Sequence, residues 1–186
     1  LFELRRIKLE YMGGKTIRPN SAPSFSWEAL GYPHVSELLL PRTGVGHSPA
    51  ATAAWLATAK ETGENPILCA QAEDYLQRAG LTTGSGVPGV MPMAYPITSF
   101  ELCYGLYPLV LAGLIHHPML RDAIQPKLTK LRAMLEKEGG LGFGEGFIAD
   151  VDDTAVAVAV LRAGNQSTDT TFVRRFWNKD HFYTYV

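Results

Sequence analysis

The sequence predicts an all-α protein, and three observations lead to this fold class. Several segments combine high helix propensity with a capping residue at the start and glycine near the end. Gly- and Pro-rich loops separate these segments, and few runs alternate as strands do. The 186 residues are 46% hydrophobic, which is enough for a packed core. Antiparallel helix pairs joined by Gly-rich turns predict a helical barrel or a solenoid.

The first helix is expected over residues 1–12, where apolar side chains recur at helical spacing and two glycines follow. The clearest helix starts are Ser48-Pro49 and Asn65-Pro66, in which a capping side chain precedes proline at the first helical position. The other expected helices are 27–30, 35–40, 50–62, 67–79 (stopped by Gly80), 99–116, 120–137, 153–163 and 170–177, with loops at 15–26, 82–92 and 139–146.

The Gly- and Pro-rich loop at 82–92 is the expected domain boundary, which divides the chain into domains 1–92 and 93–186. The sequence does not begin with Met and starts within a helical pattern, so we expect it to be a piece of a longer protein.

Composition excludes several classes of function. Net charge is close to zero, with 17 Lys and Arg against 18 Asp and Glu, and no basic stripe suggests a nucleic-acid partner. The longest apolar stretch, 103–115, is interrupted by glycine and proline, so no membrane span is expected. Cys69 and Cys103 lie in apolar runs and are expected to be buried free thiols, which suits a reducing, cytoplasmic location.

The strongest chemical signal is the cluster of Asp150, Asp152 and Asp153, which apolar residues flank on both sides. An uncharged run at 155–161 follows, so we expect a helix buried all round, with the carboxyl groups at its N-terminal end facing a cavity. Clustered carboxyl groups at a dry site cannot all ionise, which leaves a protonated acid at neutral pH. The alternatives are a divalent metal site, which needs the same groups ionised, and simple helix capping.

Four segments then carry a resemblance to one family. Residues 150–155 (DVDDTA) resemble the DxDD(T)A motif of class II diterpene cyclases of the copalyl diphosphate synthase type. Three further segments fall in the family's order: 48–53 (SPAATA), 86–92 (GVPGVMP) with Phe100-Glu101, and 140–143 (GLGF). The resemblance extends over about residues 27–185.

The resemblance implies an all-α architecture of (α/α) double-barrel terpenoid cyclase domains, with part of a γ domain at 1–92 and part of a β domain at 93–186. It implies protonation-initiated bicyclisation of geranylgeranyl diphosphate to a copalyl diphosphate-type product, with the diphosphate retained. Asp152 would donate the proton, and Asp150 and Asp153 would support it. Mg²⁺ would enter with the substrate diphosphate, with ligands outside this chain.

Further expectations follow from the same resemblance. Lys8 is the nearest match to a basic residue that contacts the diphosphate in relatives, although a solvated helix lysine is the simpler alternative. Gly89 and a residue near Ser26 replace the His–Asn dyad of plant ent-type members, so the pattern is more fungal or bacterial. Fungal members often carry a class I or prenyltransferase domain, and the sequence leaves open whether the full-length protein has such a fusion. Alone, these 186 residues are expected to be inactive.

A dry, aromatic-lined pocket would have to protect the cation. The candidates for such a lining are Trp27, Tyr104, Phe143 and Phe147, each with the alternative of being plain core.

Three other functions compete with the cyclase hypothesis. Residues 147–154 also fit the hhhDxDxT pattern of haloacid-dehalogenase-type, Mg²⁺-dependent phosphatases, with Asp150 as nucleophile and Asp152 as acid and base. That fold requires a β-strand ending at Asp150. A non-enzymatic helical scaffold would explain the helices but not the acidic cluster. A class I terpene synthase requires DDxxD, and Val156 occupies the position of its last aspartate.

Overall fold

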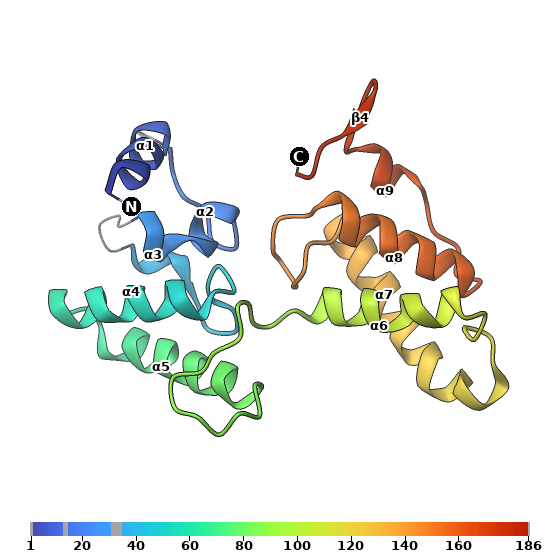
Figure 1. The fold of residues 1–186 in the computed structure, drawn as a ribbon, viewed down its shortest axis with the longest axis horizontal. Helices are drawn as coiled ribbons and strands as arrows, with labels where there is room; N and C mark the ends of the chain where they lie inside the picture. Colours follow the sequence, from blue (N-terminus) through green and yellow to red (C-terminus); the bar gives the residue numbers. More distant parts are fainter. Residues whose placement is uncertain (1, 13–14, 31–34, 186) are drawn as a thin grey trace. The chain divides into compact units, whose positions relative to one another are not determined.

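The computed structural model describes residues 2–12, 15–30 and 35–185, and the chain divides into two compact units, Leu1–Pro96 and Ile97–Val186. Helices dominate both units (Figure 1), and the strands within the described residues are two residues long each. The predicted all-α class is therefore confirmed. No helix in the described part of the chain is long and apolar enough to cross a membrane.

The N-terminal unit is built around a pair of packed helices. Its elements are α1 (Phe2–Met12), α2 (Ala22–Phe25), α3 (Trp27–Leu30), the 3₁₀ turn η1 (Ser36–Leu38), β1 (Leu39–Leu40), β2 (Gly44–Val45), α4 (Pro49–Thr62) and α5 (Pro66–Leu81). Helix α4 packs against α5 and α3 (Figure 1), and the fully buried Trp55 fills the core between these elements.

The capping signals explain where α4 and α5 begin. The Ser48 side chain accepts a hydrogen bond from the Ala51 amide at 3.1 Å, and Asn65 accepts one from the Ile67 amide at 2.9 Å. Both helix starts are therefore confirmed. The predicted stop at Gly80 is wrong, because α5 continues to Leu81. One glycine weakens a helix by only about 1 kcal/mol, which does not by itself end it.

Two other expectations for this unit were wrong. The expected loop at 15–26 contains α2, because Ser21 and Ser24 form a reciprocal capping box. The expected helix at 35–40 is a 3₁₀ turn followed by β1, which pairs antiparallel with β2. This pairing places Leu39 opposite Val45, and both side chains are buried.

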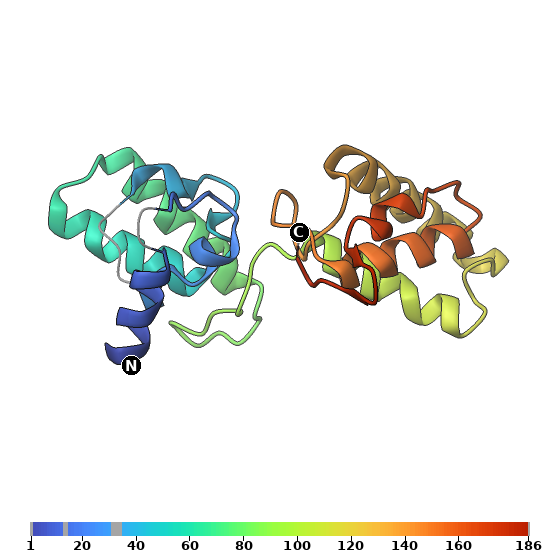
Figure 2. The ribbon, with the colours of Figure 1, turned by 90° about the horizontal axis from the view of Figure 1, so that it is seen from above.

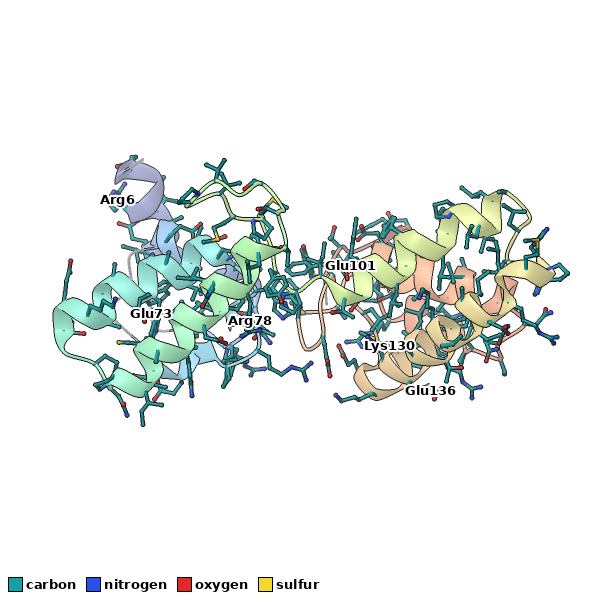
Figure 3. All side chains as sticks on the ribbon, turned by 90° about the horizontal axis from the view of Figure 1, so that it is seen from below. Arg6, Glu73, Arg78, Glu101, Lys130 and Glu136 are labelled. Atoms are coloured by element: carbon teal, nitrogen blue, oxygen red, sulfur yellow. The ribbon has the colours of Figure 1, made fainter. Side chains whose placement is uncertain are left out.

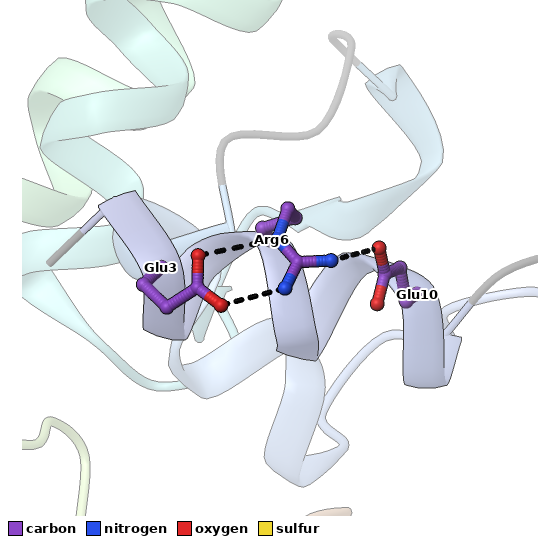
Figure 4. A network of polar contacts seen from close by, with 3 residues as sticks. All are labelled: Glu3, Arg6 and Glu10. Carbon is purple, nitrogen blue, oxygen red and sulfur yellow. Dashed lines mark hydrogen bonds and ion pairs between the residues drawn. The ribbon is translucent and has the colours of Figure 1, made fainter.

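Helix α1 carries a small network of charges on its surface. Arg6 bonds Glu3 at 2.6 Å and Glu10 at 2.5 Å (Figure 4), and all three side chains are largely exposed. Such exposed pairs add little to stability. Lys8 lies in the same helix, but its side chain falls outside the part of the chain that the structure describes.

The C-terminal unit packs three long helices around one core. Its elements are α6 (Thr98–Leu111), η2 (Pro118–Leu120), α7 (Arg121–Glu138), α8 (Val151–Ala163), α9 (Thr171–Arg174), β3 (Trp177–Asn178) and β4 (His181–Phe182). Helices α6, α7 and α8 contact one another (Figure 2), and buried leucines and valines fill the space between them. The side chains of Glu101 on α6 and of Lys130 and Glu136 on α7, which are labelled in Figure 3, are exposed.

The boundaries of these helices differ from the sequence expectation by more than one residue at three places. The helix expected over 99–116 ends at Leu111, because Gly113 adopts a left-handed φ of 69° and the Leu114 amide bonds back to Leu109. Helix α8 begins at Val151 rather than at Asp153. The last expected helix, 170–177, ends at Arg174, since Trp177 pairs with Phe182 in the β3–β4 hairpin.

Candidate functional site

A Gly-rich loop, residues 139–150, ends at the first of the three aspartates, and we call it the aspartate loop. It begins where α7 ends in the left-handed conformation of Gly139, with φ 71°. Gly142 passes so close to the Ile148 carbonyl that a side chain at position 142 would collide with it. The rings of Phe143 and Phe147 stack with centroids 4.1 Å apart. The loop is therefore folded back on itself rather than extended.

Thr154 ties this loop to the first turn of α8. Its hydroxyl group accepts a hydrogen bond from the Leu141 amide at 2.9 Å and donates one to the Leu141 carbonyl at 3.1 Å. The same carbonyl accepts a hydrogen bond from the Asp150 amide at 3.0 Å. Thr154 is fully buried, so these hydrogen bonds are shielded from water. The threonine of the motif thus fixes the backbone that carries the first aspartate.

The structure brings the three aspartates together at the N-terminus of α8, but in different environments. Asp150 is the N-cap residue, and its Oδ1 accepts a hydrogen bond from the Asp153 amide at 2.9 Å. Asp150 is 6% exposed and Asp153 is 3% exposed, whereas Asp152 is exposed. Among the described residues, no group hydrogen-bonds the buried Oδ1 of Asp153. The capping hypothesis is therefore correct for Asp150, but it does not account for Asp152 or Asp153.

The expectation that α8 is buried all round was wrong. Ala159 and Arg162 are exposed together with Asp152, so the helix has one face toward the core and one face away from it. The alanine side chain has little apolar surface, so burying it contributes little to stability. A cavity of about 620 Å³ borders the opposite end of α8, at Gly164 and the two residues that follow it.

Burial changes the acidity of two of the three carboxyl groups. Desolvation, augmented by the neighbouring carboxyl groups and opposed by the Asp153 amide, raises the pKa of Asp150 to about 8. Desolvation and the charge of Asp152 raise the pKa of Asp153 to about 6. At neutral pH the cluster therefore retains a proton, as the sequence predicts for clustered carboxyl groups at a dry site.

Helix α6 contributes a thiol and a phenol beside the cluster. The Cys103 thiol lies 3.7 Å from the Asp153 carbonyl, and burial raises the pKa of Cys103 to about 12. Tyr104 stacks on Phe100 with ring centroids 4.3 Å apart. Partial burial, and then the charge of Asp152, raise the pKa of Tyr104. Cys103 is a buried free thiol as expected, whereas Cys69 is only partly buried.

The aromatic candidates fall into two groups. Tyr104, Phe143 and Phe147 belong to the C-terminal unit, where the Phe100 amide donates a hydrogen bond to the Phe143 carbonyl at 3.1 Å. This bond joins the stacked pair on α6 to the stacked pair on the aspartate loop. Trp27 is 3% exposed in the core of the N-terminal unit.

Tyr185 was not among the residues predicted from the sequence, and its backbone forms an antiparallel bridge with Asp150. Partial burial and the charges of the three aspartates raise its pKa. No local pattern could have indicated this approach, because 35 positions separate the two residues. The aromatic residues Phe182, Tyr183 and Tyr185 lie close together in the sequence, but they do not indicate which segment they approach.

The structure also bears on the rival chemistries. Across residues 2–12, 15–30 and 35–185, no group of three or more His, Cys, Asp or Glu side chains converges as metal ligands would. Residues 139–149 form a loop, and Asp150 precedes a helix, so the β-strand that a haloacid-dehalogenase-type phosphatase requires before Asp150 is missing from this described segment.

Comparisons with known proteins agree on one family. No known protein-family model matches the chain. The chain is 39% identical over 185 residues to a (+)-kolavenyl diphosphate synthase of Herpetosiphon aurantiacus, covering 100% of this chain and 35% of that protein. It is 31% identical over 145 residues to a copalyl diphosphate synthase of Streptomyces cyslabdanicus, covering 76% of this chain and 24% of that protein.

A solved structure, the ent-copalyl diphosphate synthase from Streptomyces platensis, superposes with a TM-score of 0.70 at 25% identity. The match covers 96% of this chain and 33% of that one. The fold is thus that of the terpene cyclase (α/α) barrels, and the chain spans about a third of the length of the first of these relatives. By sequence and by fold, the chain belongs to the class II diterpene cyclases.

Proposed function

We propose that the full-length protein protonates a terminal carbon–carbon double bond of geranylgeranyl diphosphate and closes two rings while the diphosphate stays attached. Loss of a proton from the resulting carbocation would then give a product of the copalyl diphosphate type. The observation that carries this proposal is the cluster of Asp150, Asp152 and Asp153 at the start of α8, in which two of the three carboxyl groups are buried; burial raises the pKa values of these two groups. The names of the relatives, which are kolavenyl and copalyl diphosphate synthases, support it.

The unequal exposure of the aspartates suggests a role for each. An alkene is a very weak base, so its protonation needs an acid that is both protonated and accessible. Asp152 has the accessible carboxyl group, and we assign it as the donor. Asp150 and Asp153 lie buried beside it with raised pKa values, and we assign to them the role of keeping a proton in the cluster that passes to Asp152 for donation.

The cation formed by protonation requires a surface that stabilises positive charge and excludes water. Aromatic faces provide this, with cation–π energies of about 2 kcal/mol when the ring is desolvated. Tyr104, stacked on Phe100, and the Phe143–Phe147 pair would supply such faces near the acid. The two pairs are linked by the hydrogen bond from the Phe100 amide to the Phe143 carbonyl.

We further propose that Mg²⁺ accompanies the substrate diphosphate and does not bind the aspartate cluster. Mg²⁺ prefers ionised oxygen ligands, whereas the raised pKa values of Asp150 and Asp153 favour protonated carboxyl groups.

Lys8 is proposed as a diphosphate contact. Residues 1–92 and 93–186 are proposed to be parts of the γ and β domains. A class I or prenyltransferase domain elsewhere in the protein and the absence of a nucleic-acid partner also remain proposals.

The test is an assay of the full-length protein with geranylgeranyl diphosphate, in which the products are dephosphorylated and identified by mass spectrometry. We expect Asp152→Ala to reduce cyclisation by about 10²–10⁴-fold, as loss of a general acid does. Asp122→Ala is the matched control, because Asp122 is also an exposed acid in the first turn of a helix. Robust cyclisation by Asp152→Ala would refute the mechanism.

A phosphatase assay with Mg²⁺ and a generic phosphate ester distinguishes the cyclase from a haloacid-dehalogenase-type phosphatase. Under the proposed function, the wild-type protein releases no phosphate from this ester. Phosphate release that depends on Asp150, without any cyclised product, would support the phosphatase instead.

A further inference from the structure

The C-terminal segment of the chain contacts both ends of the aspartate loop. At one end, Arg175 Nη1 donates a hydrogen bond of 2.7 Å to the carbonyl of Gly139, where the loop begins. At the other end, the Val151 amide donates a hydrogen bond of 3.0 Å to the Thr184 carbonyl, directly after the loop. We call residues 175–185 the clamp segment.

The clamp segment has structure of its own. Phe176 is fully buried and anchors its start. The β3–β4 hairpin follows, with the rings of Trp177 and Phe182 4.9 Å apart, and the Tyr183 amide bonds back to the Phe176 carbonyl at 2.8 Å. The hairpin therefore returns the chain to the point at which Thr184 and Tyr185 meet the start of α8.

At this meeting point, the backbone of Asp150 is held from two sides. Its amide bonds to the Leu141 carbonyl on one side, and the antiparallel bridge to Tyr185 lies on the other. The first turn of any helix leaves amide groups without helical partners. Here Thr184 satisfies the Val151 amide and the Asp150 side chain satisfies the Asp153 amide. The segment carrying the acids is thereby fixed in position and in direction.

We propose that the clamp segment is a positioning element that holds Asp150, and with it the neighbouring donor carboxyl group, in the orientation that proton transfer requires. Its kinetic consequence rests on the proposed cyclase function, whereas the restraint of the loop does not. A displacement of about 1 Å in a catalytic group can cost on the order of 100-fold in rate, so a restraint at both ends of the loop bears directly on turnover.

The test removes one hydrogen bond without removing the helix. Val151 is the first residue of α8, where proline is well tolerated, and Asp150 has the extended backbone (φ −121°, ψ 164°) that a residue before proline adopts. Val151→Pro therefore deletes the N–H that reaches Thr184. Val151→Ala is the matched control, because it shortens the side chain but keeps the N–H.

Amide hydrogen exchange of residues 140–150 in the full-length protein is the first measurement. We expect this loop to exchange at least about tenfold faster in Val151→Pro than in Val151→Ala. With geranylgeranyl diphosphate as substrate, we expect kcat to fall about tenfold or more in Val151→Pro, with KM changed less than twofold. Partial unfolding would also lower the apparent kcat without changing KM, so kcat is normalised to the folded fraction measured by circular dichroism, and only a fall that persists after this correction supports positioning.

A second variant acts on the other end of the clamp. Arg175→Gln removes the charged donor to Gly139 and leaves the backbone of the aspartate loop intact, and we expect the same direction of change in exchange and in kcat. Equal exchange in Val151→Pro and Val151→Ala would overturn the inference whether or not the enzyme is active. Faster exchange with an unchanged kcat would overturn the positioning role, whereas a wild-type protein without cyclised product would contradict the proposed function instead.

Discussion

Replacing Asp150 by Asn tests the electrostatics of the site independently of catalysis. Asparagine caps helices as well as aspartate does, so the hydrogen bond to the Asp153 amide is kept. The folded state raises the pKa of Asp150 from its ordinary value of 3.8 to about 8. Between these two values the folded state keeps a proton that the unfolded state releases, so the stability of the wild-type protein falls as the pH rises.

Asp150→Asn has no such proton to keep, so its stability relative to the wild type should increase from about pH 4 to about pH 8 and then level off. The full shift would correspond to about 6 kcal/mol, at about 1.4 kcal/mol for each pKa unit. Solvent around the exposed Asp152 screens the site, so we expect an advantage of about 2–3 kcal/mol at pH 8.5.

The assay is the free energy of opening from amide hydrogen exchange of the α8 core, measured at pH 5 and pH 8.5 in the full-length protein. Asp169→Asn is the control, because hydrogen bonding from Thr171 lowers the pKa of the exposed Asp169. That variant should gain nothing as the pH rises. An Asp150→Asn advantage that is equal at both pH values, or larger at pH 5, would refute the reasoning.

Two further predictions concern residues that support the cluster. Thr154→Val should destabilise the C-terminal unit by about 2–3 kcal/mol in denaturant titrations, because the buried Leu141 amide loses its acceptor. Thr154→Ser keeps the hydroxyl group and should destabilise the unit by only about 1 kcal/mol. Equal losses of stability in the two variants would contradict this role of the hydroxyl group. Cys103 should resist a thiol reagent in the native protein while the partly exposed Cys69 reacts, since burial raises the pKa of Cys103 to about 12. Labelling of both thiols at the same rate, followed by absorbance or mass, would contradict the burial of Cys103.

The features that could be predicted from the sequence are those that neighbouring residues determine. Ser48 and Asn65 cap α4 and α5 by accepting hydrogen bonds from amides two or three positions along the chain. Such bonds depend on local residues alone, so the pattern of a capping side chain followed by proline identifies them. The position of the acidic cluster at a helix start was accessible in the same way, although the exact first residue was not.

The features that could not be predicted depend on contacts between distant residues. The hydrogen bond from Arg175 to Gly139 spans 36 positions, and nothing in the sequence near either residue indicates it. The sequence at 35–40 has helical character, but β1 forms there because Leu39 and Leu40 find partners in β2. Tertiary pairing overrides local propensity at such places.

The spacing of the three acids has a physical reason in the first turn of α8. Asp150 is the N-cap and Asp153 the third residue of the helix, and these two positions fold toward one another in capped helices. Asp152 lies one residue earlier than Asp153, which turns its side chain about 100° around the helix axis. Two carboxyl groups are thereby buried while the third is exposed. Under the proposed function, one helical turn places two buried carboxyl groups, which support the protonation of Asp152, beside the exposed carboxyl group that delivers the proton.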